Sequence, residues 1–268
     1  MPIFKKAKIK KLEEKGEQNS ALKEMTEAGV AFGHRTSKLH PKMKSYILGM
    51  RSTIHIIDLS QTIPHLEKAL KLIEQIAKED GQVLLVGTRI QFQEIIEETA
   101  KKCNFPYVNH RWIGGTLTNF KVVGSRVNHL KELEDKEEKG ELKKYTKKEQ
   151  LDFKNQVKKL ENKFGGLKNM SALPQAIFII DFDKNFLAAK EARSKGIKTI
   201  ALVDTNMNPQ LVDYPIPAND DALSSVKYIL DKMTEKVIGI QQENKKMRPK
   251  KPQDKPKVEE QEKIEKKK

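Results

Sequence analysis

The stretch around which the rest of the chain is organised is Asn109-His110-Arg111-Trp112-Ile113-Gly114-Gly115-Thr116-Leu117-Thr118-Asn119-Phe120. It contains the only tryptophan of the chain, a pair of glycines, and basic residues flanked by hydroxyl and amide side chains. Strand-like and helix-like segments alternate before this stretch, a charged helical pattern follows it over residues 121–168, and then the alternation resumes. An insertion therefore leaves the main fold here, which makes this stretch the first place to look for function.

The segments on either side of the insertion predict an α/β body. Residues 82–87 and 176–181 are nearly continuous apolar runs, as in strands buried on both faces of a sheet. We expect further strands at 53–59, 107–108 and 198–204, and helices at 21–28, 62–78, 90–102, 186–194 and 220–237. This order predicts a doubly wound parallel sheet, Rossmann- or flavodoxin-like, with helices on both faces, formed by residues 20–120 and 169–240.

The inserted segment, residues 121–168, has a periodicity of its own. Apolar residues recur at steps of four and three in its second half, which is the seam of a coiled coil: Phe153, Val157, Leu160, Phe164 and Leu167. Val123, Val127 and Leu130 repeat this spacing in the first half, and Gly140 lies between the halves. The pattern predicts an antiparallel coiled-coil hairpin that projects from the body.

Charge and composition indicate the class of partner. The chain has 52 Lys and Arg against 37 Asp and Glu, a formal charge of +15. An anionic partner such as nucleic acid explains this surplus of positive charge better than solubility alone does. Residues 1–19 predict a flexible basic extension, and residues 241–268 a disordered tail rich in Lys and Pro. No apolar run has the length of a membrane span or a signal peptide, so we expect a cytoplasmic protein without a membrane partner.

Two stretches are candidates for contact with RNA. The loop-like residues 30–44 concentrate basic and titratable side chains, although an ordinary polar loop is the alternative. In residues 109–121, an arginine offers a forked donor to phosphate, hydroxyl and amide groups can bind ribose, and Trp112 is expected to pack between body and hairpin. The predicted RNA-binding residues are Arg35, Lys38, Lys42, Lys44, His110, Arg111, Thr116, Thr118, Asn119 and Lys121.

An enzyme on a Rossmann-like fold, acting on a small molecule or a nucleotide, is the alternative function. Gly87 is the one glycine after the strand at 82–87, where a dinucleotide fingerprint needs three. The chain also lacks the glycine-rich phosphate loop and the serine elbow, and Cys103, its only cysteine, has no obvious base beside it. The sequence therefore predicts no catalytic residues and no required cofactor.

Acidic residues gather where predicted strands end. Asp204, Asp220 and Asp221 should meet at one sheet edge together with His34, and such a mixture of ligands suits a structural Zn²⁺, or a Mg²⁺ with water ligands. Two alternatives remain at this stage. The acidic pair 220–221 can simply be charges that the dipole of the last helix favours at its N-terminus. Alternatively, Arg35, Arg89 or a neighbouring Lys can neutralise the cluster.

The stretch 109–119 closely resembles the signature segment of bacterial ribosomal protein two of the small subunit. Further pieces agree in order and spacing: Ala28-Gly29-Val30-Ala31-Phe32-Gly33-His34, Pro41-Lys42-Met43-Lys44, Val86-Gly87-Thr88, Leu173-Pro174, Val203-Asp204-Thr205-Asn206 and Asn219-Asp220-Asp221-Ala222. The resemblance covers about residues 22–238.

The resemblance implies a Rossmann-like body with a protruding coiled-coil hairpin and a structural, non-catalytic role in the small ribosomal subunit. It implies binding to small-subunit ribosomal RNA between head and body, and help in recruiting the messenger-binding ribosomal protein one. It also implies a zinc ion near His34, Asp204, Asp220 and Asp221.

Overall fold

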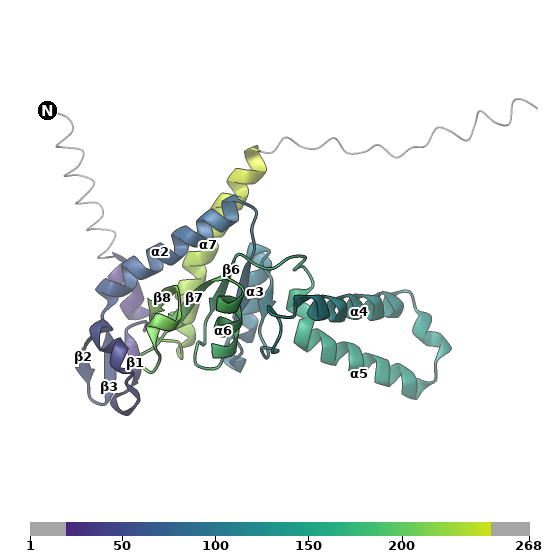
Figure 1. Cartoon of the computed structure of the whole chain (residues 1–268), viewed down its shortest axis with the longest axis horizontal. Coiled ribbons are helices and arrows are strands. Elements are labelled where there is room, and N and C mark those ends of the chain that lie inside the picture. Colours follow the sequence, from purple (N-terminus) through teal and green to yellow (C-terminus); the bar gives the residue numbers. More distant parts are fainter. Residues whose placement is uncertain (1–19, 248–268) are drawn as a thin grey trace, which may run out of the picture.

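A five-stranded parallel sheet forms the centre of the computed structural model, which describes residues 20–247 and, within them, all side chains except those of 141, 143 and 244–247 (Figure 1). Its strands are β4 (Val83–Val86), β5 (Tyr107–Val108), β6 (Ala176–Ile179), β7 (Lys198–Val203) and β8 (Tyr214–Pro217). The spatial order is β5-β4-β6-β7-β8, and every neighbouring pair is parallel. The doubly wound sheet is therefore confirmed, and its strand order reverses between β4 and β6.

The fifth strand of this sheet is not the one expected from the sequence. The sequence predicts a strand of this sheet at residues 53–59, but β3 (Ile54–Ile57) pairs antiparallel with β1 (Phe32–Arg35) and β2 (Ile47–Arg51) in a separate sheet of order β1-β3-β2. Its place is taken by β8, whose Pro215 and Pro217 hide it from a search for strand patterns. Proline is tolerated there because β8 is an edge strand.

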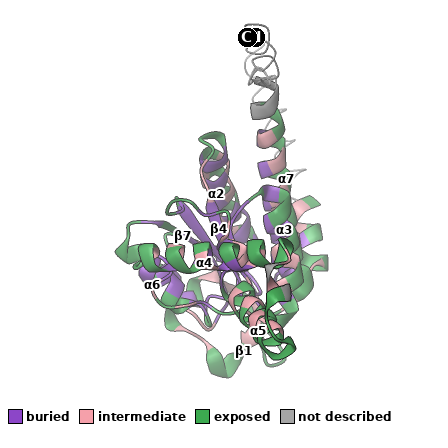
Figure 2. Ribbon diagram, turned by 90° about the vertical axis from the view of Figure 1, so that its right-hand side faces the viewer, coloured by how far each residue is buried: buried purple, intermediate pink, exposed green. Residues whose placement is uncertain are grey.

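Helices cover one face of the parallel sheet completely. Residues 20–27 are helical, and α2 (Leu59–Lys78), α3 (Gln93–Cys103) and α7 (Leu223–Met247) pack with apolar side chains of β4, β6, β7 and β8 in one buried cluster. Tyr107 of β5 packs against this cluster. Asp58 begins α2 three residues earlier than expected, because its carboxylate accepts a hydrogen bond from the Ser60 backbone at 3.0 Å. Figure 2 shows the buried strands enclosed between exposed elements.

The other face is covered by a mixture of elements. A single short helix, α6 (Phe186–Ser194), packs on it beside Trp112, Leu117 and the base of the inserted segment. These join side chains of β4, β6 and β7 in a second buried cluster. Helices therefore lie on both faces, as expected, but on this face loop residues replace part of the helical cover.

The inserted segment forms the predicted hairpin. Helices α4 (Phe120–Glu138) and α5 (Lys147–Phe164) lie side by side and project away from the body (Figure 1). Thr146 and Glu149 form a capping box that begins α5, since each accepts a hydrogen bond from the backbone of the other.

The two halves of the coiled-coil seam are covered to different extents. On α4 the seam residues Val123, Val127, Leu130 and Leu133 are all buried. In the second half Phe164 and Leu167 are buried, whereas the seam positions nearer the tip are half-buried: Phe153, Val157 and Leu160. The hairpin is therefore held most firmly at its base, where its residues share the second buried cluster with Trp112.

The base of the hairpin is also tied to β5. A Cβ atom on Gly166 would lie 2.2 Å from the backbone oxygen of Tyr107, so only glycine permits this close approach. The Lys168 ammonium, beyond the end of α5, lies 2.6 Å from a carboxylate oxygen of Glu134 on α4 and 3.8 Å from one of Glu161 on α5. These contacts fix the direction in which the hairpin leaves the body.

The last helix is longer than expected. α7 ends at Met247, beyond residue 240, after which the sequence predicts the tail. The rest of the tail and residues 1–19 lie outside the described residues.

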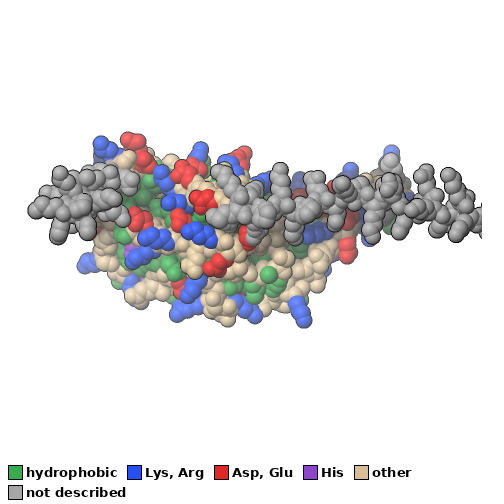
Figure 3. Space-filling model, turned by 90° about the horizontal axis from the view of Figure 1, so that it is seen from above, with side chains coloured by type: hydrophobic (Ala, Val, Ile, Leu, Met, Phe, Trp, Pro, Cys, Tyr) green, Lys and Arg blue, Asp and Glu red, His purple; other side chains and the backbone are tan. Residues whose placement is uncertain are grey.

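Within residues 20–247, no helix combines the length and apolar composition that crossing a bilayer requires. On the visible part of the face in Figure 3, basic and acidic side chains are interspersed, so that face presents no patch of a single charge.

The different burial of the two seam halves makes a testable prediction. Leu130→Ala should lower the free energy of unfolding by about 2–5 kcal/mol, because this side chain is fully buried. Leu160→Ala serves as the matched control and should cost clearly less, since Leu160 is half-buried. Urea denaturation of both variants measures the difference, and equal losses would contradict the asymmetry.

Candidate nucleic-acid interface and cation cluster

The loop of residues 109–119 is organised by one buried carboxylate, that of Glu191 on α6. One oxygen accepts hydrogen bonds from the Trp112 indole N–H at 3.1 Å and the Gly115 backbone N–H at 2.8 Å. The other accepts from the backbone N–H groups of Leu117 at 3.1 Å and Thr118 at 3.2 Å, and from the Thr118 hydroxyl at 3.1 Å. Five donors thus converge on a single side chain.

The hydrogen bonds to Glu191 outweigh its burial. Burial on its own disfavours the charged carboxylate, but the donors of Gly115, Trp112, Leu117 and Thr118 stabilise it and lower the pKa of Glu191. The carboxylate is therefore ionised at neutral pH, and its charge holds the loop in place.

This arrangement sorts the loop into buried and exposed side chains. Trp112 and Leu117 point into the second buried cluster, and Gly115 makes the turn with a φ of +93°. Thr116 is buried, and its hydroxyl donates to the Ile113 carbonyl at 2.6 Å. The exposed side chains include Thr118, whose hydroxyl is held by Glu191, and also His110, Arg111, Asn119 and, at the start of α4, Lys121.

The basic loop after β1 is anchored in the same way, with its lysines pointing outward. Met43, in the 3-10 helix Pro41–Tyr46, is fully buried, and the His40 backbone N–H donates to the Thr205 carbonyl at 2.8 Å. The side chains exposed around these anchors are Arg35, Lys38, Lys42 and Lys44, of which Lys42 donates to the Gln210 side chain.

Both stretches lie along the same edge of the parallel sheet. Residues 109–119 follow β5, and the basic loop is tied to Thr205, which follows β7. Because the carboxyl ends of parallel strands share one edge, the exposed cations of both stretches belong to that edge. This is the edge at which doubly wound proteins bind their ligands.

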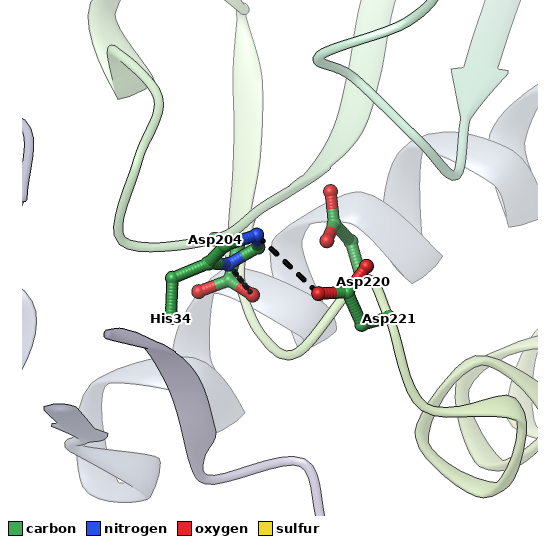
Figure 4. A group of neighbouring side chains, drawn as sticks. All are labelled: His34, Asp204, Asp220 and Asp221. Atoms are coloured by element: carbon green, nitrogen blue, oxygen red, sulfur yellow. Dashed lines mark ion pairs between the residues drawn. The ribbon is translucent and has the colours of Figure 1, made fainter. Parts of the chain in front are cut away.

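The predicted metal ligands do come together. His34, Asp204, Asp220 and Asp221 each offer a ligand atom, and these atoms lie within 4.8 Å of one another (Figure 4). His34 Nδ1 lies 2.8 Å from Asp204 Oδ2, and His34 Nε2 lies 3.3 Å from Asp221 Oδ2. The sheet topology thus collects side chains from three distant parts of the chain.

Some of these ligand atoms are buried without a hydrogen bond. Both carboxylate oxygens of Asp220 make none with the described residues, and His34 Nδ1 and Asp204 Oδ2 have only each other as partners. Asp220 is fully buried, and this desolvation, reinforced by the neighbouring charge of Asp204, raises the pKa of Asp220 to about 7. Such a carboxylate is stabilised by a positive charge placed among these atoms.

Arg89 supplies part of that charge. Its guanidinium donates to the Asp220 backbone carbonyl at 2.8 Å and to the Asp221 carboxylate, and lies 3.5 Å from Asp220 Oδ1. The hydrogen bond with Asp204 favours the protonated imidazole and raises the pKa of His34. The alternative of neutralisation by Arg89 is thus realised in part, since Asp220 remains without a hydrogen bond to either oxygen.

The other acids at strand ends have different roles. Asp58 caps α2, and Asp181 accepts hydrogen bonds from the Thr88 backbone at 3.1 Å and from the Asn185 amide at 2.5 Å. Gly87, which could suggest a phosphate loop, packs closely in the core, because a Cβ there would lie 2.4 Å from Ile96 Cδ1 and would displace that buried side chain. The edge of β4 therefore has the close packing of a core and no glycine-rich cradle.

Comparison with known proteins agrees with this geometry. The family model described as ribosomal protein S2 matches residues 25–239. The small ribosomal subunit protein uS2 of Dehalococcoides mccartyi (strain ATCC BAA-2266 / KCTC 15142 / 195) is 46% identical over 220 residues, which is 82% of this chain and 90% of that protein. The protein of the same name from Francisella tularensis subsp. novicida is 44% identical over 222 residues, 83% of this chain and 93% of that protein.

The chain belongs to the ribosomal protein S2 family. As a member of the S2 family it is a structural, non-enzymatic constituent of the small ribosomal subunit, with ribosomal RNA and ribosomal proteins as its partners. This membership confirms the resemblance and the expected location on the cytoplasmic ribosome, and it excludes the enzyme alternative.

The geometry separates the predicted RNA-binding residues of this S2 protein into two groups. Nine are exposed and Thr116 is buried, and the hydroxyl groups of Thr116 and of the exposed Thr118 are both occupied inside the protein. Sequence reasoning missed Glu191 altogether. The residue lies 79 positions beyond Trp112 in a charged helical stretch, where an ordinary surface role is the natural interpretation, and its only signal is its place on the buried side of α6.

Replacing Glu191 tests its role in the loop. Glu191→Gln keeps the size of the side chain but leaves one acceptor oxygen, so buried donors lose their partner at roughly 1–3 kcal/mol each. We expect a lower free energy of unfolding at pH 7, measured in urea, and little change for the exposed control Glu94→Gln.

The pH dependence of this loss has a defined sign. Because folding lowers the pKa of Glu191, its contribution is present above the unfolded pKa of about 4.3 and is lost as pH falls through the lower folded pKa. The difference between parent and Glu191→Gln should therefore shrink on acidification below that range. A difference that stays constant would refute the assignment.

Proposed function

We propose that this S2 protein binds small-subunit ribosomal RNA through the carboxyl edge of its sheet, between the head and the body of the subunit. The observation that carries the proposal is the loop held by Glu191, which buries Trp112 and Leu117 and leaves Arg111 exposed beside His110. Arg111 makes no hydrogen bond or ion pair with the described residues, so its forked donors are free for a phosphate.

The basic loop extends the same surface. Arg35, Lys38 and Lys44 are exposed and, within residues 20–247, form no ion pair, so they offer charge to an anionic partner. Asn119 and Lys121 continue this surface towards the hairpin. Contacts of this kind fix the orientation of a protein on RNA but do not read its sequence. The location between head and body is carried over from the family resemblance.

A second part of the proposal concerns a protein partner. In the S2 family, as the resemblance implies, members help to recruit the messenger-binding ribosomal protein one, and we propose this role for the present chain. The sequence pieces around His34 and around Asp220, which carry the resemblance, meet at the carboxyl edge of the sheet.

Arg111→Ala tests the RNA interface. Binding of the purified protein to small-subunit RNA should weaken with salt, and each phosphate contact contributes roughly 0.7–0.9 to the slope of log affinity against log salt. The variant should lower both the affinity and this slope, as measured by filter binding. Lys71→Ala removes the same charge from α2, on the opposite face of the sheet, and should change neither. An unchanged slope for Arg111→Ala would leave this residue with no role in phosphate binding.

We also propose that His34, Asp204, Asp220 and Asp221 hold one structural divalent cation. The support is the fully buried Asp220, both of whose oxygens lack a hydrogen bond, together with an imidazole nitrogen 2.8 Å from Asp204. One nitrogen with carboxylate oxygens suits Zn²⁺, and Mg²⁺ with water ligands is the second candidate. The ion would tie β1 to the ends of β7 and β8.

Metal analysis decides this point. Extensively dialysed protein should retain about one equivalent of divalent metal per chain, and Asp220→Asn should lose it. Asp183→Asn alters an exposed carboxylate near the cluster and should keep the metal. If the parent protein holds no metal and zinc does not raise its melting temperature, Arg89 alone neutralises the cluster.

A further inference from the structure

A cavity of about 630 Å³ lies beside the cation cluster, between the basic loop and the ends of the parallel strands. Charged side chains from four separate parts of the chain line it: Arg35, Lys38, Arg89, Asp183, Lys184 and Asp221. Arg89 follows β4 and Lys184 follows β6, so the cavity opens where the strand order reverses. Ligands of doubly wound proteins bind at this point of the sheet.

The charges around the cavity favour an anion. Four cationic side chains face two carboxylates, and one of these carboxylates, Asp221, is already paired with Arg89. Arg35, Lys38 and Lys184 are exposed and form no hydrogen bond or ion pair through their side chains with other described residues. Three unpaired cations around one cavity match the several oxygens of a phosphate.

We infer that this cavity binds a phosphate group, and that its occupancy is coupled to the cation cluster through Arg89. The phosphate belongs either to the backbone of RNA or to a free phosphate compound, and the chemistry of recognition is the same for both. The coupling, but not the phosphate site, rests on the cation site proposed above.

The coupling follows from the position of Arg89 between two sites. Its side chain is 13% exposed, lines the cavity, and at the same time contacts Asp220 and Asp221. A divalent cation on the cluster neutralises these carboxylates and releases the guanidinium to the cavity. Conversely, a phosphate that draws the Arg89 guanidinium into the cavity removes it from Asp220 and Asp221, and these carboxylates can then bind the divalent cation without competition. Each ligand must therefore strengthen binding of the other by the same factor.

The first experiment titrates inorganic phosphate into the metal-free, full-length protein and follows binding by ³¹P nuclear magnetic resonance. The parent should bind in a saturable manner, and Lys184→Met should bind several-fold more weakly. Lys195→Met, a substitution of an exposed lysine after α6, is the matched control and should bind like the parent. Identical binding by Lys184→Met and the parent would overturn the phosphate site.

The second experiment tests the coupling with Arg89→Gln, using zinc alone and phosphate alone as separate probes. Phosphate affinity should fall because a cavity donor is lost, whereas zinc affinity should rise because the competing cation is gone. A variant with a merely damaged fold would lose both affinities, and that result would overturn the coupling. Arg89→Lys keeps the charge and should lie between the parent and Arg89→Gln for zinc.

The salt dependence of RNA binding distinguishes the two sources of the phosphate, the RNA backbone and a free phosphate compound. If Lys184→Met lowers the salt slope for small-subunit RNA by roughly 0.7–0.9, the phosphate belongs to the RNA backbone. If the slope is unchanged while inorganic phosphate binds, the ligand is a free phosphate compound. The RNA interface at Arg111 is measured with a different variant, so its failure and the failure of this cavity are distinguishable.

Discussion

The hydrogen bonds that converge on the Glu191 carboxylate are the interaction on which the functional surface depends. They include three backbone N–H groups of one loop, those of Gly115, Leu117 and Thr118. Without the Glu191 carboxylate these three donors would lose this acceptor. Buried donors without partners would oppose the close packing of this loop on the sheet. Hydrogen bonds to an ionised group are also stronger than neutral ones, at about 1.5–3 kcal/mol each. One charge on α6 thus determines where Trp112 lies, and Trp112 lies where the hairpin joins the body.

Two buried carboxylates, those of Glu191 and Asp220, illustrate opposite uses of one functional group. Glu191 is surrounded by donors from its own chain, and its pKa is lowered. Asp220 is fully buried with no hydrogen bond to either oxygen, and its pKa is raised to about 7. The first is satisfied internally and organises a loop. The second can gain stabilisation only from added positive charge, which Arg89 supplies in part and a divalent ion would complete.

The features that the sequence predicts well are those with a local pattern. Apolar runs identified β4 and β6, a four-three repeat identified the hairpin, and the rule that parallel strands end at one edge brought His34 to Asp204 and Asp220. The features it predicts poorly depend on partners far away in the chain. Pro215 and Pro217 concealed an edge strand, the pairing of β3 with β1 and β2 has no marker in sequence, and the roles of Thr118 and Glu191 depend on a contact across 73 positions.

Amide hydrogen exchange in the free, full-length protein tests the central claim most directly. If Glu191 holds the loop in advance of any RNA, the N–H groups of Gly115, Leu117 and Thr118 should exchange slowly in the parent. In Glu191→Gln they should exchange much faster, while the amides of β4 and β6 keep their protection. Fast exchange of these three amides in the parent protein would contradict the account, because the loop would then acquire its structure only on the ribosome.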